Sequence, residues 1–273
     1  MRGFGNQKFW CHLSFSDDVE YSNKDIRKSS PLKVRTYREL VKVVAKISNH
    51  NPDHSLFYRG QPRDYTINTG ATSVYPTIYR SPGRSLTIRE LRNRYDVLEA
   101  CSSQLMEKLQ TLKIENSRKL YKFPELIWSI LQHYEVCATP LLDVTHSLRV
   151  ASSFALNNAS NDALILIFGF PYPNGTISYY AEQELLNIRL LSTCPSEALR
   201  PHFQEGFLLG NFPHKVERKQ PHLDFATRLI AKIKISKEGF WENDFHPIPD
   251  SALYPDGDRI LDICEGIKVS ANV

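Results

Sequence analysis

Helical periodicity in the first half of the chain, followed by strand-like periodicity in the second half, constrains the fold more than any other feature. Thr36–Glu39 and Thr87–Glu90 both have the spacing of a capping box, in which two side chains satisfy backbone amides in the first turn of a helix. Apolar residues then recur at intervals of three and four. The pattern therefore predicts amphipathic helices over residues 36–49 and 87–112.

Shorter apolar segments complete the predicted set of elements. The spacing of apolar residues favours further helices over 124–134 and 147–158. Segments 163–168, 207–209 and 228–235 are rich in β-branched and other apolar residues, which is typical of strands.

A further strand and a long loop are expected between the first two helices. Residues 55–59 are apolar and aromatic, which predicts a strand, and we expect Gly60 to end it in a tight turn. Residues 61–85 contain five prolines and glycines and are predicted to form a loop. Loops of that length in a compact domain are usually functional or mobile.

Helices followed by strands, with no linker between them, predict an α+β fold. We expect a single mixed domain over residues 35–273, in which a helical first half packs on a central β-sheet. This half includes a helical segment over 86–134. Residues 1–34 are polar and show no strong period, and we interpret them as an N-terminal extension.

Composition and charge exclude several classes of protein. With 41% hydrophobic residues, a chain of 273 residues can bury a sizeable core, which excludes wholesale disorder. A net charge of +4 is too small to indicate a nucleic-acid-binding protein by itself. No stretch approaches the roughly 18 apolar residues of a membrane span, so no membrane association is expected. Five scattered cysteines and the absence of a secretory signal favour a reducing, cytoplasmic location.

Several catalytic signatures are absent from the sequence. The motifs of P-loop proteins, dinucleotide-binding folds, zincins and α/β-hydrolases do not occur. No CxxC pair indicates structural zinc, and no metal is expected. A nuclease-like site around His202, His214 and Asp224 is an alternative, although their spacing fits no pair of ligands on one helix.

Several groups of polar residues could carry chemistry. One of them, the basic stretch His214–Arg228 with Lys215, Arg218, Lys219 and His222, could track phosphates or be a solvated loop. The first group that contributes predicted site residues follows the predicted strand 55–59. The guanidinium fork of Arg59 suits a phosphate or a carboxylate, and Gly60 lets a ligand approach the backbone. Gln61 completes the group. The alternative is that Arg59 is an ion-pair partner at a surface turn.

The second group lies around the end of the predicted helix 124–134. His133 and Tyr134 end this helix, and Asp143 and Thr145 precede the next one. They could line a polar site. Alternatively, His133 is a core histidine and Thr145 is a helix cap.

The third group is Arg200–Phe207, where Gln204 and Glu205 stand just before Gly206 and a short predicted strand. This arrangement could place an amide or a carboxylate in a cleft, or it could be an exposed turn. Adjacent strand residues face opposite sides, so Gln204 and Glu205 cannot both line one cleft unless a bulge intervenes.

Taken in order, these pieces resemble the FRG domain family, which is named for its (Phe/Tyr)-Arg-Gly motif. The resemblance covers residues 35–265 and rests on six segments in the family's order: Tyr58–Gln61, Tyr75–Arg80, Leu131–Tyr134, Thr139–Thr145, Arg200–Phe207 and Leu253–Asp256. Val144 departs from the pattern, because the family usually has Trp there. At a weaker level, the layout is similar to ADP-ribosyltransferase-like folds.

The resemblance implies an FRG-domain protein that uses NAD+ as substrate or ligand. The implied activity is that of an ADP-ribosyltransferase or an NAD glycohydrolase-like enzyme in bacterial or phage conflict, as a toxin or in antiviral defence. The acceptor would be a protein or a nucleic acid.

The implied catalytic residues are Arg59 for the diphosphate, Tyr134 for stacking on nicotinamide, and Gln204 or Glu205 for the ribose. The implied substrate-binding residues are Gly60, Gln61, Arg80, His133, Asp143, Thr145 and Arg200.

A second hypothesis is a non-catalytic module that senses a nucleotide or nucleic acid and regulates a partner effector protein. It keeps the Arg59 pocket. This hypothesis is also consistent with the side chain of Gln204, which is an amide at the position where ADP-ribosyltransferase-like enzymes usually have a catalytic carboxylate.

Overall fold

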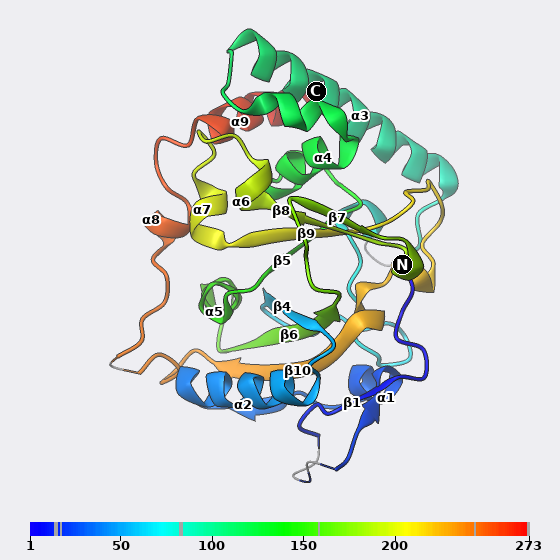
Figure 1. Cartoon of the computed structure of the whole chain (residues 1–273), viewed down its shortest axis with the longest axis vertical. Coiled ribbons are helices and arrows are strands. Elements are labelled where there is room, and N and C mark those ends of the chain that lie inside the picture. Colours follow the sequence, from blue (N-terminus) through cyan, green and yellow to red (C-terminus); the bar gives the residue numbers. More distant parts are fainter. Residues whose placement is uncertain (14–15, 17, 82–83, 158, 243, 272–273) are drawn as a thin grey trace.

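The computed structural model describes residues 1–13, 16, 18–81, 84–157, 159–242 and 244–271 (Figure 1). The α-helices in this part of the chain are α1 (Asn23–Lys28), α2 (Tyr37–His50), α3 (Ile88–Thr111), α4 (Pro124–His133), α5 (Leu148–Asn157), α6 (Leu190–Thr193), α7 (Arg200–Gln204), α8 (Asp250–Leu253) and α9 (Arg259–Ala271). The strands are β1 (Lys8–Phe9), β2 (Tyr21–Ser22), β3 (Leu32–Val34), β4 (Ser55–Gln61), β5 (Leu142–Thr145), β6 (Asp162–Phe170), β7 (Ile177–Tyr180), β8 (Leu185–Arg189), β9 (Gly206–Asn211) and β10 (Leu229–Ser236).

The long helices form where the apolar periodicity predicts them. Helix α2 follows Thr36, whose hydroxyl accepts a hydrogen bond from the amide of Glu39. Helix α3 begins with a complete capping box between Thr87 and Glu90. Residues 82, 83 and 158, which belong to a predicted loop and a predicted helix, lie outside the described residues.

Eight strands form one mixed sheet in the order β3-β10-β6-β4-β5-β9-β8-β7, and β1 and β2 form a separate pair. Strand β3 runs parallel to β10, and the other neighbouring pairs of the sheet are antiparallel. Helices α1 and α2 lie near the β10 end of the sheet, and α3, α4 and α9 lie near the β7–β8 end (Figure 1). The predicted α+β fold with a central sheet is confirmed.

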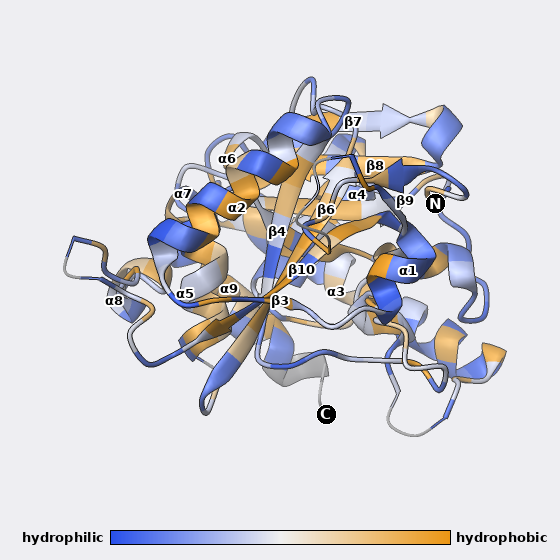
Figure 2. Ribbon diagram, turned by 90° about the horizontal axis from the view of Figure 1, so that it is seen from below, coloured by the Kyte–Doolittle hydropathy of each residue, from blue (hydrophilic) through white to orange (hydrophobic). Residues whose placement is uncertain are grey.

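Two clusters of buried apolar residues stabilise the fold. One surrounds β6 and β10 and includes Leu40 and Ile47 of α2. The other joins α3, α4 and α9 to β8 and β9. Figure 2 shows apolar strands in the interior, while α1 and α2 carry hydrophilic residues on part of their surface. Removal of this apolar surface from water is the main favourable contribution to folding.

The sequence predicts residues 1–34 as an N-terminal extension, and several described residues of this segment belong to the first cluster. Phe9 and Trp10 are among the largest fully buried side chains, and β3 pairs with β10. This segment is therefore part of the same folded unit. Among the described residues, no helix combines the length and the apolar character that a membrane crossing needs.

Of the neighbouring pairs in the eight-stranded sheet, β4 and β5 share the shortest register. Strand β4 pairs with β6 along its whole length, from Ser55 to Gln61. Its register with β5 consists of one pair, Tyr58 with Thr145. Beyond this pair the strands separate, so the two halves of the sheet enclose a space instead of continuing a hydrogen-bonded ladder.

Strand β4 continues through Gly60 to Gln61, so the predicted tight turn at Gly60 is wrong. A Cβ atom on Gly60 would lie 1.9 Å from the carbonyl oxygen of Ala151 and 2.9 Å from the backbone nitrogen of Ala155, both on α5. The glycine therefore permits close approach between a strand and a helix, which is one of the recognised reasons for a glycine inside a strand.

We expect Gly60→Ala to lower the free energy of unfolding by about 1–3 kcal/mol, because the obstructing atoms include helix backbone that cannot rotate away. Gly175→Ala is the matched control, since the nearest atom to its added Cβ is 3.9 Å away. Chemical denaturation of both variants measures the difference. Equal stability of the two variants would contradict this explanation of Gly60.

Candidate functional site

A cavity of about 820 Å³ opens where β4 and β5 separate. Its walls come from β4, β5, α5, the loop after β4, the end of α4, α7 and the segment after α8. All the sequence-predicted site residues except Tyr134 and Glu205 line it: Arg59, Gly60, Gln61, Arg80, His133, Asp143, Thr145, Arg200 and Gln204. Segments far apart in the sequence thus converge on one space.

Arg59 spans the gap between the separating strands. Its Nη1 donates a hydrogen bond of 2.6 Å to the carbonyl oxygen of Asp143. Burial lowers the pKa of Arg59, while the charge of Asp143 acts in the opposite direction. Guanidinium groups titrate far above neutrality, so Arg59 remains a cation in the cavity.

Asp143 is held by side chains from two elements. One carboxylate oxygen accepts a hydrogen bond of 2.7 Å from Gln132, and the other lies 3.6 Å from Nδ1 of His133. Burial raises the pKa of Asp143, but the hydrogen bond and charge of His133, followed by the charge of Arg59, outweigh it. The net shift of the pKa is downward. Asp143 is therefore a carboxylate at neutral pH.

Gln132 orients this carboxylate and was not among the predicted site residues. Its amide oxygen accepts hydrogen bonds from the hydroxyls of Thr77 (3.2 Å) and Thr139 (2.5 Å). With its oxygen engaged, the amide must present its NH₂ group to Asp143. Gln132 lies in the Leu131–Tyr134 segment, of which only the histidine and the tyrosine were predicted as site residues.

The rim of the cavity carries further cations and aromatic rings. Arg80 lines the mouth of the cavity, with part of its side chain open to solvent and part enclosed by the walls, and its Nε donates to the carbonyl oxygen of Tyr75 over 2.7 Å. Burial within the cleft, followed by the charge of Arg59, lowers the pKa of Arg80 to about 10. Lys219 lies over the ring of Tyr75, 4.0 Å from its centroid. Lys219 was not among the predicted site residues.

The cavity is cationic overall. Arg59, Arg80, Arg200 and Lys219 face two carboxylates, Asp143 and Glu135. The aromatic lining comprises Tyr58, Tyr65, Tyr75, Phe154 and Tyr254. Burial raises the pKa of Tyr58 to about 12, so its hydroxyl stays protonated at neutral pH. Cations interleaved with aromatic rings suit an anionic ligand that also carries rings.

Thr145 and Gln204 line the cavity and also hold its wall together. The hydroxyl of Thr145 lies 3.1 Å from the carbonyl oxygen of Gln204 and 3.2 Å from that of Glu205, and donates to this pair. Nε2 of Gln204 donates to the carbonyl oxygen of Leu253 over 2.7 Å. These contacts fasten α7 to β5 and to the end of α8.

Tyr134 and Glu205 lie outside the cavity lining. Tyr134 is 3% exposed, and its hydroxyl donates to Asp258 over 2.7 Å. Glu205 is exposed and ends α7 in a left-handed conformation, with φ of 45°. The change of backbone direction at Glu205 separates its side chain from that of Gln204.

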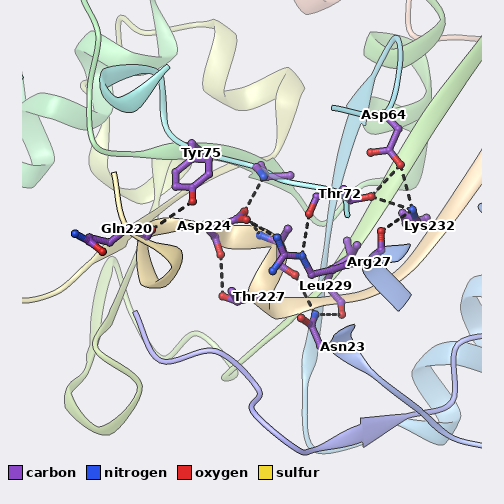
Figure 3. A network of polar contacts seen from close by, with 12 residues as sticks. Asn23, Arg27, Asp64, Thr72, Tyr75, Gln220, Asp224, Thr227, Leu229 and Lys232 are labelled. Atoms are coloured by element: carbon purple, nitrogen blue, oxygen red, sulfur yellow. Dashed lines mark hydrogen bonds and ion pairs between the residues drawn. The ribbon is translucent and has the colours of Figure 1, made fainter. Parts of the chain in front are cut away.

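A buried polar network anchors the loop that forms one wall of the cavity (Figure 3). Asp224 is 2% exposed and accepts hydrogen bonds from the backbone amide of Val74 (2.7 Å) and from Arg27 (2.6 Å). Nε of Arg27 also donates to the carbonyl oxygen of Thr72 over 2.8 Å. The network thereby fixes a stretch of backbone that leads directly to Tyr75.

Lys232 extends the same network from β10 to the start of the loop. Its ammonium donates to Asp64 (3.1 Å) and to the hydroxyl of Thr72 (2.9 Å). Its side chain is 3% exposed. A buried ammonium needs such partners, because an unpaired charge is costly to remove from water.

The histidines considered for a nuclease-like site have separate surroundings. His202 is exposed on α7, whereas His214 packs against Tyr95 and Trp128. Asp224 belongs to the network above. The described residues contain no group of three or more His, Cys, Asp or Glu side chains that could hold a metal ion.

Comparison with known proteins adds one match. Residues 54–163 match the family model described as FRG domain. No curated protein and no solved structure matches the chain. The matched range contains Arg59, Gly60 and Asp143, whereas Arg200 and Tyr254 lie beyond it.

Proposed function

This chain carries an FRG domain, and we propose that its cavity binds NAD+ as the substrate of ADP-ribosyl transfer or of glycohydrolysis. The observation that carries the proposal is the convergence of Arg59, Arg80 and Arg200 on one cavity of about 820 Å³. Guanidinium groups suit the two phosphoryl groups of a dinucleotide. The resemblance to ADP-ribosyltransferase-like folds favours NAD+ among such ligands.

The chemistry requires negative charge beside the ribose. Cleavage breaks the bond between C1′ and the nicotinamide nitrogen, and the bonding electrons leave with nicotinamide. Positive charge develops on the ribose, so a carboxylate fixed nearby stabilises the transition state. We infer that Asp143 supplies this charge, because it lines the cavity and its lowered pKa keeps it ionised.

The second step is attack on C1′ by water or by a hydroxyl group of an acceptor, which loses its proton. Water gives ADP-ribose, and an acceptor gives an ADP-ribosylated protein or nucleic acid. A role in bacterial or phage conflict, as a toxin or in antiviral defence, rests on the resemblance alone and completes the proposal.

A non-catalytic nucleotide sensor is the second candidate, and a specific observation favours it. Glu205 lies outside the cavity lining, and Gln204, which lines it, is an amide engaged with Leu253. The position at which related transferases have a carboxylate thus supplies no acid to the cavity. A sensor would hold NAD+ or a related nucleotide and pass the signal to a partner effector.

Incubation with NAD+ and chromatography of the products test the first candidate. We expect nicotinamide release by the wild-type protein, and a kcat roughly 100-fold or more lower in Asp143→Asn, as for the loss of one preorganised charge. Asn keeps the shape of the side chain, so calorimetric titration should still detect NAD+ binding to that variant.

The same two measurements separate the candidates. Saturable binding without nicotinamide release supports the sensor. Neither binding nor release by the folded wild-type protein would contradict both.

A further inference from the structure

Arg200 differs from the other two arginines of the cavity in how its guanidinium is held. Arg59 donates to a backbone carbonyl, and so does Arg80. Within the described residues, the guanidinium of Arg200 has neither a carboxylate partner nor a hydrogen-bond acceptor, and its Nε is buried. Guanidinium groups rarely stay unpaired in partly buried positions, because the lost hydration is not replaced.

Two aromatic rings hold Arg200 in place. Its guanidinium carbon lies 5.2 Å from the ring centroid of Tyr134 and 5.0 Å from that of Tyr254. Tyr134 is buried, whereas Tyr254 is 45% exposed at the cavity. Rings attract the cation without using its N–H donors, so the donors remain available to an anion.

Asp258 fixes the base of this arrangement. One of its carboxylate oxygens accepts hydrogen bonds from the backbone amides of Leu199 and Arg200, both 3.0 Å, and from the hydroxyl of Tyr134 at 2.7 Å. Its other oxygen accepts from the amides of Ile260 and Leu261. The carboxylate thus positions the backbone of Arg200 and the ring beneath its side chain, and makes no direct contact with the guanidinium.

Arg200 belongs to a different part of the cavity from Arg59. Arg59 lies on β4 and donates to Asp143 of β5, and Arg80 donates to Tyr75 in the loop that follows β4. Burial, followed by the charge of Arg59, also lowers the pKa of Arg80. Arg200 lies at the start of α7, and its guanidinium packs on the ring of Tyr254, which directly follows α8. The cavity therefore presents an Arg59–Arg80 group and an Arg200–Tyr254 group.

We propose that Arg200 and Tyr254 form a second phosphate subsite, so that the preferred ligands are nucleotides with two linked phosphoryl groups. The Arg59–Arg80 group binds one phosphoryl group, and Arg200 binds the other through its planar fork. Tyr254 is a positioning residue that acts through Arg200. This inference rests on the proposed function and names the substrate class of the same cavity.

Calorimetric titration of the full chain with NAD+, ADP and AMP tests the subsite. We expect the wild-type protein to bind ADP more tightly than AMP. Arg200→Gln should weaken ADP and NAD+ binding roughly 10- to 100-fold, as for one charge-assisted hydrogen-bonding group, and leave AMP affinity unchanged. Arg259→Gln is the matched control, since Arg259 is exposed, pairs with Glu197 and does not line the cavity.

Variants of Tyr254 distinguish a role in positioning Arg200 from a general loss of structure. Tyr254→Phe keeps the ring over Arg200 and should retain the preference for ADP, whereas Tyr254→Leu should lose part of it. Thermal unfolding of each variant establishes that it is folded. A wild-type protein that binds none of the nucleotides contradicts the proposed function. NAD+ binding that Arg200→Gln leaves intact contradicts the subsite alone.

Discussion

Replacement of Asp224 by alanine should lower the free energy of unfolding by about 3–5 kcal/mol, the range found when one partner of a buried ion pair is removed. The change leaves Arg27, whose side chain is 15% exposed, without its carboxylate. It also removes the acceptor of the backbone amides of Val74 and Ala226. Urea denaturation, with circular dichroism as the probe, measures the loss.

Two further variants identify which part of the interaction matters. Asp224→Asn keeps an oxygen for the backbone amides and removes the charge, so its stability should lie between those of wild type and Asp224→Ala. Asp162→Ala is the matched control, because Asp162 pairs with Lys234 in an exposed position, where such pairs contribute about 0–1 kcal/mol. A loss in Asp224→Ala no larger than in this control would contradict the stabilising role of the network.

Arg59→Ala should reduce kcat/KM for NAD+ roughly 30- to 1000-fold, corresponding to about 2–4 kcal/mol for one lost charged donor. The reason is twofold. The variant loses a cation that faces the ligand, and it loses the bond from Nη1 to the carbonyl oxygen of Asp143 that spans β4 and β5. Nicotinamide release at several NAD+ concentrations gives kcat/KM.

Controls distinguish ligand binding from damage to the fold. Arg259→Ala removes an exposed arginine that pairs with Glu197 and does not line the cavity, and it should leave kcat/KM unchanged. Arg59→Lys keeps the charge without the planar fork and should fall between wild type and Arg59→Ala. A folded Arg59→Ala protein with wild-type kcat/KM would remove the centre of the proposed function.

Local signals in the sequence account for the elements that were predicted well. The helices α2 and α3 begin at threonines whose hydroxyls accept a backbone amide three residues later, and this interaction needs no distant partner. Strands β6 and β10 consist mostly of buried apolar residues, so their composition alone indicates them. Strands β5 and β8 were not predicted, because each includes charged or polar residues whose environment depends on neighbouring strands.

The residues of the candidate site were likewise predicted only in part. The order of motifs pointed to Arg59, Asp143 and Gln204, and all three line one cavity. The motifs did not indicate that Gly60 accommodates α5, nor that Tyr134 supports Arg200 from outside the cavity lining. Both facts depend on atoms that lie many residues away in sequence.

The amino-acid sequence by itself determined the helices with local caps, the apolar strands and the set of polar residues available for chemistry, because these follow from interactions between near neighbours. Only the tertiary structure decided that β4 and β5 part after Tyr58 and Thr145, and which side chains face the resulting cavity. The separation of two strands and the direction of a side chain depend on packing between segments that are distant in the sequence. The free energy of that packing cannot be inferred from a local sequence pattern.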